Sequence, residues 1–387
     1  MTMSTLLPSF YKSTLKNKLK RSEYLILLII IGLLQKYQIS TIEELANKFP
    51  SPILFESRRK KIQRFLSLSH LSFGTIWFPI LSVWLSLHFS PFSVLYLAID
   101  RTEWTGVNLL FVSIIYQKRA IPIYLTILPK KGASNFREQQ EVLAKILPLF
   151  SNYKKVVLGD REFCSVGLAQ WLREQTETYF CLRLKKNEYI EIKQNIWMQL
   201  KDLSPKPGVN FYLQGVKITK TKGFGQGEVA GKWARKYRDK KSSEDAWFIS
   251  TNLGDFSQAI NSYQKRFGIE ELFRDIKSGG YQIDKTLAHG DRLISLILLI
   301  TLAYSSAFLT GEKIQQKRQI KYVSRVKEKN RYVKRHSYFY IGLHGKDWVE
   351  SLNYFEKIAE SLMALSPHKR PNYKRGNRAA TIIKSTL

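Results

Sequence analysis

The chain has 387 residues and a formal net charge of +31, from 62 lysines and arginines against 31 aspartates and glutamates. This charge indicates a polyanionic partner, with nucleic acid preferred over an anionic membrane surface. A hydrophobic share of 44% excludes a disordered basic tail protein, and the two cysteines, Cys164 and Cys181, exclude a disulfide framework or a zinc set. We expect one large core or two to three domains, with reduced thiols, in the cytoplasm.

Residues 1–90 have the patterning of helices and are predicted to form a helical DNA-binding domain. A helix start is expected near Thr41, with Ser40 or Thr41 as the cap. Basic residues gather beside the apolar helices in two clusters. The clusters are Lys12, Lys16, Lys18, Lys20 and Arg21, and then Arg58, Arg59, Lys60, Lys61 and Arg64. For either cluster alone, a solvated helix face is the alternative.

From Val94 onwards the pattern changes to that of strands. The run 94–99 is apolar at every position and is followed by Asp100, as expected for a strand buried on both faces. A second short apolar run ends in Asp160. The predicted order is strand 94–99, strand 109–116, strand 121–128, helix 137–150, strand 154–160, helix 166–173, strand 178–184 and, after an interruption, strand 246–251. A lone aspartate after a strand is usually a turn or cap residue, but two of them invite a functional interpretation.

The segment 260–280 is predicted to form one helix, because it lacks proline and ends in a pair of glycines. At about 100° per residue, Tyr263, Arg266, Glu270 and Lys277 fall on one narrow stripe beside an apolar face. The stripe places one carboxylate between two cations and a phenol. An ordinary helix surface of mixed charge is the alternative.

The spacing Tyr-x2-Arg-x3-Glu-x6-Lys, in the context IEELFRDIKS, resembles the YREK signature of the insertion-sequence group four family of DDE transposases. The resemblance implies that Glu270 is the last of three catalytic carboxylates. Asp100, in IDRTEW, and Asp160, in DREF, resemble the family's other two boxes. The implied fold class is α/β, a ribonuclease H-like mixed sheet flanked by helices. Its first and fourth strands lie side by side, so that both aspartates meet at one edge.

This interpretation divides the chain into three parts. They are a helical DNA-binding domain at 1–90, a catalytic domain at 91–310 with a β-rich insertion at about 187–245, and a basic C-terminal helical region and tail at 311–387. Within the last part, 313–335 is predicted to be a helix on a DNA surface or a flexible linker. The segment 347–365 is predicted to form one amphipathic helix, and the tail 369–387 to stay disordered until it meets DNA.

The apolar run Leu293–Leu309 approaches the length of a membrane span. It contains serines, a threonine and a tyrosine, and it directly follows the segment 260–280. We therefore predict a buried core helix and no membrane association.

Under the resemblance, Asp100, Asp160 and Glu270 bind two Mg²⁺ ions, with Mn²⁺ able to substitute. Two divalent ions about 4 Å apart can activate an attacking oxygen and stabilise a leaving one. Carboxylate oxygens are the ligands that Mg²⁺ prefers. The histidines have no metal-ligand spacing, so the carboxylates are the predicted ligands.

Other residues are predicted to bind DNA. Arginine binds phosphate oxygens bidentately and lysine binds them as a point charge. An aromatic ring can stack on a base extruded at a cut site, although filling the core is an equal alternative for Trp247. The predicted DNA-binding residues are Tyr263, Arg266, Lys277, Trp247, Arg161, Arg58, Arg59, Lys60 and Lys61.

The predicted function is that of a transposase, which binds the ends of an insertion sequence, cuts them and joins them to target DNA. It is expected to act on double-stranded DNA as a homodimer in a paired-end complex, in the cytoplasm with the nucleoid. One alternative is a ribonuclease H-like nuclease or resolvase without strand transfer. Another is a non-catalytic DNA-binding derivative, which metal-dependent nicking would exclude.

Overall fold

The computed structural model describes residues 7–104, 106–203, 208–220, 224–233, 246–326 and 335–387. The chain divides into two compact units. One consists of residues 81–274, and the other joins residues 1–80 to residues 275–387. The boundaries between the units fall inside two helices, α5 (Phe78–His88) and α9 (Phe267–Ile276).

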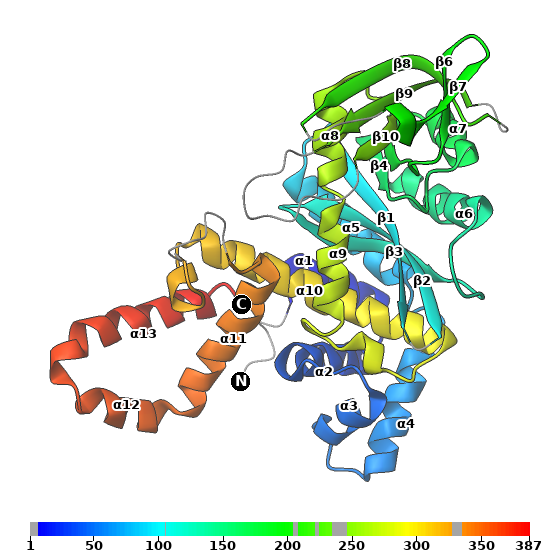
Figure 1. Ribbon diagram of the computed structural model, residues 1–387. Helices are drawn as coiled ribbons and strands as arrows, with labels where there is room; N and C mark the ends of the chain where they lie inside the picture. Colours follow the sequence, from blue (N-terminus) through cyan, green and yellow to red (C-terminus); the bar gives the residue numbers. More distant parts are fainter. Residues whose placement is uncertain (1–6, 105, 204–207, 221–223, 234–245, 327–334) are drawn as a thin grey trace. The chain divides into compact units, whose positions relative to one another are not determined.

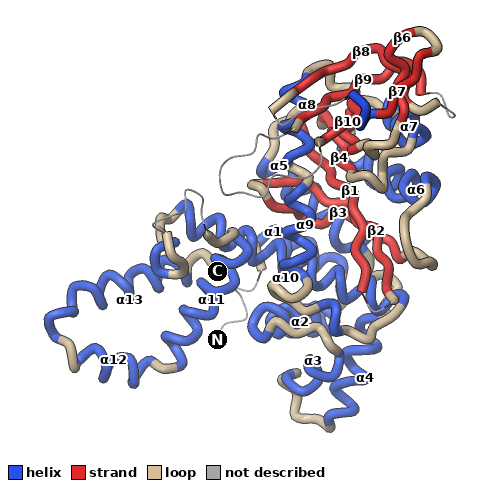
Figure 2. Tube along the Cα trace, viewed as in Figure 1, coloured by secondary structure: helices blue, strands red, loops and turns tan. Residues whose placement is uncertain are grey.

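The unit of residues 81–274 is built on one mixed sheet (Figures 1 and 2). In the described residues its order is β3-β2-β1-β4-β5-β10-β9-β8-β6-β7. The strands are β1 (Val94–Trp104), β2 (Val107–Tyr116), β3 (Arg119–Ile127), β4 (Lys154–Gly159), β5 (Thr178–Arg183), β6 (Tyr189–Lys193), β7 (Ile196–Gln199), β8 (Asn210–Ile218), β9 (Phe224–Lys232) and β10 (Trp247–Thr251). Strand β4 pairs in parallel with β1 and β5, and the other neighbours are antiparallel. The predicted α/β class with a ribonuclease H-like mixed sheet is confirmed.

The central strands are covered on both faces. Every residue of β2 from Asn108 to Ile115 is buried, and so is every residue of β4 from Lys155 to Gly159. Strands of this kind need helices on both sides of the sheet. Helices α6 (Phe136–Ile146) and α7 (Val166–Glu174) pack together against one side, and α8 (Phe256–Gln264) lies against β10, β5 and β4 on the other (Figure 1). The turn η3 (Leu147–Phe150) completes the predicted helix 137–150.

The predicted insertion at 187–245 is β-rich, as expected. It contains β6, β7, the turn η4 (Leu200–Leu203), β8 and β9. These strands extend the same sheet, because β9 pairs along β10 from Lys232 opposite Trp247 to Glu228 opposite Thr251. Residues 204–207, 221–223 and 234–245 of the insertion lie outside the described residues.

Strand β1 does not end at Ile99, as predicted, but continues to Trp104. The reason is its neighbour β2, which pairs with β1 as far as Val107 opposite Trp104. On its other side, the parallel ladder between β1 and β4 ends at Ile99 opposite Gly159. Asp100 therefore lies inside β1, at the level where β4 ends.

The prediction of a single helix over 260–280 was wrong, because α8 and α9 are separated at Lys265 and Arg266. The amides of these two residues donate to carbonyls three residues back, which tightens the chain. The glycine that follows, Gly268, lies against the β2–β3 hairpin. A Cβ there would be 3.2 Å from Cδ1 of Ile115, so the break lets α9 approach the sheet closely.

The unit of residues 1–80 and 275–387 is helical. Its long helix, α10 (Gly290–Gln316), packs against α2 (Arg21–Tyr37), α4 (Phe55–Leu66) and α11 (Tyr338–Tyr354). By length and mean hydropathy, 2.1, α10 could cross a membrane, but 94% of its apolar window is buried inside the protein. The predicted buried core helix is confirmed.

The remaining helices correct two predictions for the C-terminal region. They are α1 (Ser9–Lys18), α3 (Ile42–Lys48), α12 (Glu356–Ala364) and α13 (Arg370–Lys384), with the turns η2 (Phe73–Trp77), η5 (Ile283–Lys285), η6 (Ile320–Tyr322) and η7 (Pro367–Lys369). The single helix predicted over 347–365 is divided between α11 and α12 at Phe355. The tail forms α13 and is not disordered, because its Ile383 packs into an apolar cluster with Ile314, Ile341 and Val349.

Helices α10 and α11 approach each other backbone to backbone at two glycines. A Cβ on Gly311 would lie 1.9 Å from the carbonyl oxygen of Tyr338, and one on Gly342 would lie 1.8 Å from that of Ala307. Glycine is required at both positions, since no other residue leaves this space free.

Candidate active site

Asp100 and Asp160 lie on neighbouring backbone segments at the same level of the sheet, because the residues just before them are paired in the β1–β4 ladder. The Oδ1 atom of each accepts a backbone N–H from a residue one or two positions later in the chain. Arg101 donates to Asp100 over 2.8 Å, and Glu162 donates to Asp160 over 2.9 Å. Both carboxylates are thus held at the carboxyl end of β4.

Arg266 joins Asp100 to Glu270. Its Nη1 donates to Oδ2 of Asp100 over 3.0 Å, and its Nη2 donates to Oε1 of Glu270. The side chain of Arg266 is 7% exposed, whereas that of Glu270 is 49% exposed. One buried guanidinium therefore connects an aspartate of β1 with a glutamate of α9.

Burial raises the pKa of Asp100 to about 7. The positive charge of Arg266 lowers this pKa, and the negative charges of Asp160 and Glu270 raise it. Asp100 is therefore within electrostatic range of both other carboxylates. Such a group favours the approach of a cation.

By donor type, three carboxylates suit Mg²⁺, which prefers oxygen ligands. In the described part of the chain, no three His, Cys, Asp or Glu side chains gather at a spacing that could hold a metal ion. The guanidinium of Arg266 stands between Asp100 and Glu270 instead. The residues fit a divalent cation in kind, and Arg266 contacts two of them.

Three aromatic rings lie around Arg266. The ring of Trp247 is 5.3 Å from that of Tyr263, edge to face, and 5.9 Å from that of Phe267, tilted by 37°. The guanidinium carbon lies 5.8 Å from the Tyr263 ring centre and 5.2 Å from that of Phe267. Tyr263 is fully buried and Phe267 is 42% exposed. Phe267 was not among the predicted site residues, although its place directly after Arg266 could have singled it out.

A second set of polar contacts, also missed, lies on the opposite face of β1. Arg101 pairs with Glu162, with 3.1 Å between Nε and Oε2. The other oxygen of Glu162 accepts hydrogen bonds from the backbone amide and the hydroxyl of Ser134, at 2.8 and 2.7 Å. Their position in the sequence could have predicted this pair. Arg101 lies in the segment IDRTEW with Asp100, and Glu162 lies in the segment DREF with Asp160.

The four signature residues do not share one helical stripe. Tyr263 lies in α8, Arg266 between the helices, Glu270 in α9 and Lys277 after it, in the other compact unit. Lys277 is half-buried, and burial lowers its pKa. Arg161 follows Asp160 in the turn after β4 and is partly buried.

Of the two basic clusters predicted in the N-terminal region, the one that contains Arg58, Arg59, Lys60 and Lys61 lies on α4. Lys60 and Lys61 are exposed, whereas Arg58 and Arg59 are partly buried. Arg59 is paired with Glu43 of α3, with 3.1 Å between Nε and Oε1. The exposed Lys60, Lys61 and Arg64 are therefore the members of this cluster most open to a phosphate backbone.

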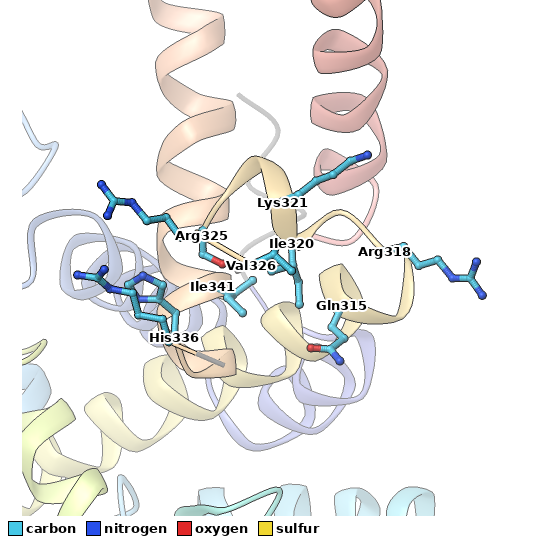
Figure 3. Close-up of a pocket in the computed structure, with 10 residues that line it drawn as sticks. Gln315, Arg318, Ile320, Lys321, Arg325, Val326, His336 and Ile341 are labelled. Carbon is cyan, nitrogen blue, oxygen red and sulfur yellow. The ribbon is translucent and has the colours of Figure 1, made fainter. Parts of the chain in front are cut away.

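The basic segment predicted at 313–335 forms part of a cavity of about 300 Å³ in the helical unit (Figure 3). The lining residues are Gln315, Arg318, Ile320, Lys321, Ser324, Arg325, Val326, Arg335, His336 and Ile341. The floor is apolar, and the side chains of Arg318 and Arg325 extend outwards on opposite sides (Figure 3). Residues 327–334 of this segment lie outside the described part of the chain.

A mixed sheet of this order, with carboxylates at the end of its central parallel strand, defines an α/β protein of the ribonuclease H-like class. The family model described as the Transposase DDE domain matches residues 110–305, half of the chain, and the chain belongs to this family. The match includes Asp160 and Glu270 and begins after Asp100. Among solved structures, the cryo-EM structure of a piggyBac transposase synaptic complex with hairpin DNA is similar, with a TM-score of 0.39 and 11% identity over 89% of this chain and 77% of that one. No curated protein matches the chain significantly.

Proposed function

We propose that the chain is a transposase of the insertion-sequence group four, which binds the ends of its element, cuts them and joins them to target DNA. The observation that carries the proposal is the grouping of Asp100, Asp160 and Glu270. Two of these acids stand at the same level of a parallel ladder, and Arg266 links the third to Asp100. The YREK spacing, which no other observation tests, supports the particular group.

In the proposed mechanism, Asp100, Asp160 and Glu270 hold two Mg²⁺ ions, which Mn²⁺ can replace. When bound, such ions activate the attacking oxygen and stabilise the leaving oxygen of a phosphodiester. The protein's own part is to hold the carboxylates in place, with Asp100 largely buried and Glu270 open to solvent. The backbone bonds to Asp100 and Asp160 fix two of the carboxylates before substrate arrives.

Further DNA contacts are proposed for residues beyond the three carboxylates. Arg266 and Lys277 face phosphates, Arg161 contacts the strand beside Asp160, and Trp247 stacks on an extruded base. Tyr263, also predicted to bind DNA, is fully buried and lies beside Arg266. Phosphate contacts position the DNA without reading its sequence. A paired-end complex of two chains on double-stranded DNA, in the cytoplasm with the nucleoid, is the proposed working form.

The DNA contacts away from the site are proposed for α4. Its exposed Lys60 and Lys61, with Arg58 and Arg59 beside them, hold the element end. Such contacts supply affinity through the release of counterions from the phosphate backbone.

The test is to incubate the chain with the DNA that flanks its gene and Mg²⁺, and to map the products. Alanine at Asp100, Asp160 or Glu270 should abolish cleavage while binding to the ends persists in Ca²⁺. The matched control is Glu271→Ala, because Glu271 is the next residue of α9 but pairs with Arg119 of the hairpin. Cleavage by Glu270→Ala at the wild-type rate would reject the assignment. Failure to join a pre-cut end would favour a nuclease.

A further inference from the structure

The guanidinium of Arg266 occupies the position between two of the proposed metal-binding carboxylates. The Arg266 side chain is 7% exposed and that of Asp100 is 15% exposed. A buried guanidinium and a buried carboxylate are stable only when paired, since both lose their hydration on burial. Arg266 therefore supplies the counter-charge that allows Asp100 to be buried beside the negative charges of Asp160 and Glu270.

The oxygens that Arg266 binds are the ones that a divalent cation needs. Mg²⁺ takes carboxylate oxygens at about 2.0–2.1 Å in near-octahedral geometry. The guanidinium instead places a nitrogen 3.0 Å from Oδ2 of Asp100 and donates to Oε1 of Glu270. A metal ion on the same oxygens would also be repelled by the guanidinium charge at this short range. The guanidinium of Arg266 and a divalent metal ion therefore compete for the same oxygens of Asp100 and Glu270.

The surroundings of Arg266 favour release of its guanidinium from the bridge between Asp100 and Glu270. The residue lies in the break between α8 and α9, outside both helices. Among the described residues, its buried Nε–H has no hydrogen-bond acceptor, so the bridge leaves one donor unsatisfied. The partly exposed ring of Phe267 lies 5.2 Å from the guanidinium carbon. A ring face at this distance attracts a guanidinium.

We propose that Arg266 is a displaceable internal cation. It bridges Asp100 and Glu270 until a divalent ion takes their oxygens, and the released guanidinium then turns to a DNA phosphate. The inference rests on the proposed function, because it takes these acids as metal ligands. Its consequence is reciprocal coupling, since a phosphate that captures Arg266 strengthens metal binding and metal binding frees Arg266 for the phosphate.

The test titrates Mn²⁺ into the full chain without DNA, by calorimetry and by thermal melting. Arg266→Gln keeps a polar side chain but removes the competing charge. It should bind Mn²⁺ about tenfold more tightly than the wild type, within the usual range of coupling between sites. In chelator it should melt below the wild type, and Mn²⁺ should raise its melting temperature by more. Equal or weaker Mn²⁺ binding by Arg266→Gln overturns the proposal.

If Arg266→Gln does not fold, Arg266→Met takes its place, because methionine is unbranched and flexible but carries no charge. A gain in Mn²⁺ affinity is again expected, and its absence overturns the proposal. The matched control is Arg274→Gln, since Arg274 lies in α9, which begins just after Arg266, but pairs with Glu271. Its Mn²⁺ affinity should equal that of the wild type, and a similar gain there would point to general charge and against Arg266.

A separate pair of variants tests the metal site itself. Asp100→Asn and Glu270→Gln should abolish Mn²⁺ binding in the wild-type and Arg266→Gln backgrounds alike. If both leave Mn²⁺ binding unchanged, the metal site and the proposed function fail together. If they abolish binding while Arg266→Gln brings no gain, only the displaceable cation fails.

Discussion

Arg101 and Glu162 form an ion pair, 3.1 Å long, that ties together the two backbone segments carrying Asp100 and Asp160. The side chains of the pair are 20% and 16% exposed. The backbone amide and the hydroxyl of Ser134 both donate hydrogen bonds to the other carboxylate oxygen of Glu162. A carboxylate held from two sides in this way fixes the spacing of the aspartates on the other face of the strand.

Glu162→Gln is expected to lower the rate of DNA cleavage about 10–100-fold, as is usual when a group that orients metal ligands is changed. Affinity for the DNA ends in Ca²⁺ should stay at the wild-type level, because Glu162 does not face the DNA in the proposed mechanism. Glu103→Gln is the control, since Glu103 also contacts Arg101 but is 40% exposed. Equal cleavage rates for Glu162→Gln and the wild type would remove Glu162 from the site.

Trp247→Ala should nick DNA but stall before the second-strand cut, if the ring stacks on an extruded base. Stacking of this kind contributes on the order of 1–3 kcal/mol per base. Because Trp247 also contacts Tyr263 and Phe267, a thermal melt must show that the variant is folded. Trp247→Phe is the control, since it keeps an aromatic face. A collapsed melt, or normal cutting of both strands, would make Trp247 a core residue only.

Much of the sheet could be predicted from the sequence, because its central strands are rich in apolar residues. The run 94–99 is apolar at every position, the shorter run 156–159 follows two lysines, and each run is followed directly by an aspartate. Parallel strands of one sheet bring such residues to the same edge. What could not be predicted is the extension of β1 to Trp104, which depends on pairing with β2.

The relationship between Arg266 and the acids could not be predicted for a similar reason. A regular helix through 260–280 would place Arg266 on an outer stripe, facing DNA. Neither residue at the break, Lys265 or Arg266, is a proline or a glycine, so the sequence does not predict a break there. It depends on the tertiary contact between Gly268 and the hairpin, and a helical wheel contains no such contact.

The double variant Lys60→Ala/Lys61→Ala should weaken DNA binding and flatten its salt dependence, because both lysines are exposed on α4. The slope of log K against log salt should change by about 0.9 for each phosphate that the variant no longer neutralises. Arg59→Ala is the contrasting variant, since Arg59 is already paired with Glu43. It should change the slope less. Affinity measured from low to moderate salt decides between these outcomes, and an unchanged slope in the double variant would remove α4 from the DNA interface.

Gly311→Ala should destabilise the helical unit, because its Cβ would lie 1.9 Å from the carbonyl oxygen of Tyr338 in α11. Forcing packed elements apart costs about 1–3 kcal/mol, which a lower melting temperature would report. Gly376→Ala is the matched control, since Gly376 lies inside α13 with nothing within 4 Å of its added Cβ. The control should be neutral or stabilising by up to about 1 kcal/mol. Equal melting of Gly311→Ala and the wild type would contradict the close approach of α10 and α11.

Asp347, in α11, should make the stability of the protein fall as the pH rises from about 4 to 7. Burial raises its pKa from 3.8 to about 6, and the negative charge of Glu350 adds to this, while Lys346 and Lys36 oppose it. Since the folded protein holds this proton more tightly than the unfolded chain, Asp347 favours folding below pH 3.8. That contribution is lost as the pH rises through 6. His344 also faces Asp347, with 3.6 Å between Nδ1 and Oδ2.

Asp347→Asn removes this titration, so its melting temperature relative to the wild type should rise between pH 4 and pH 7. The expected gain is on the order of 1 kcal/mol, because the Asp347 side chain is 33% exposed and water screens part of the effect. Repeating the comparison in a His344→Gln background distinguishes the effect of the His344 imidazole on the pH dependence from that of the Asp347 carboxyl group. Glu360→Gln, at an exposed position of α12, should show no such trend. If the difference between Asp347→Asn and the wild type stays flat across this pH range, the Asp347 carboxyl keeps an ordinary pKa in the folded protein.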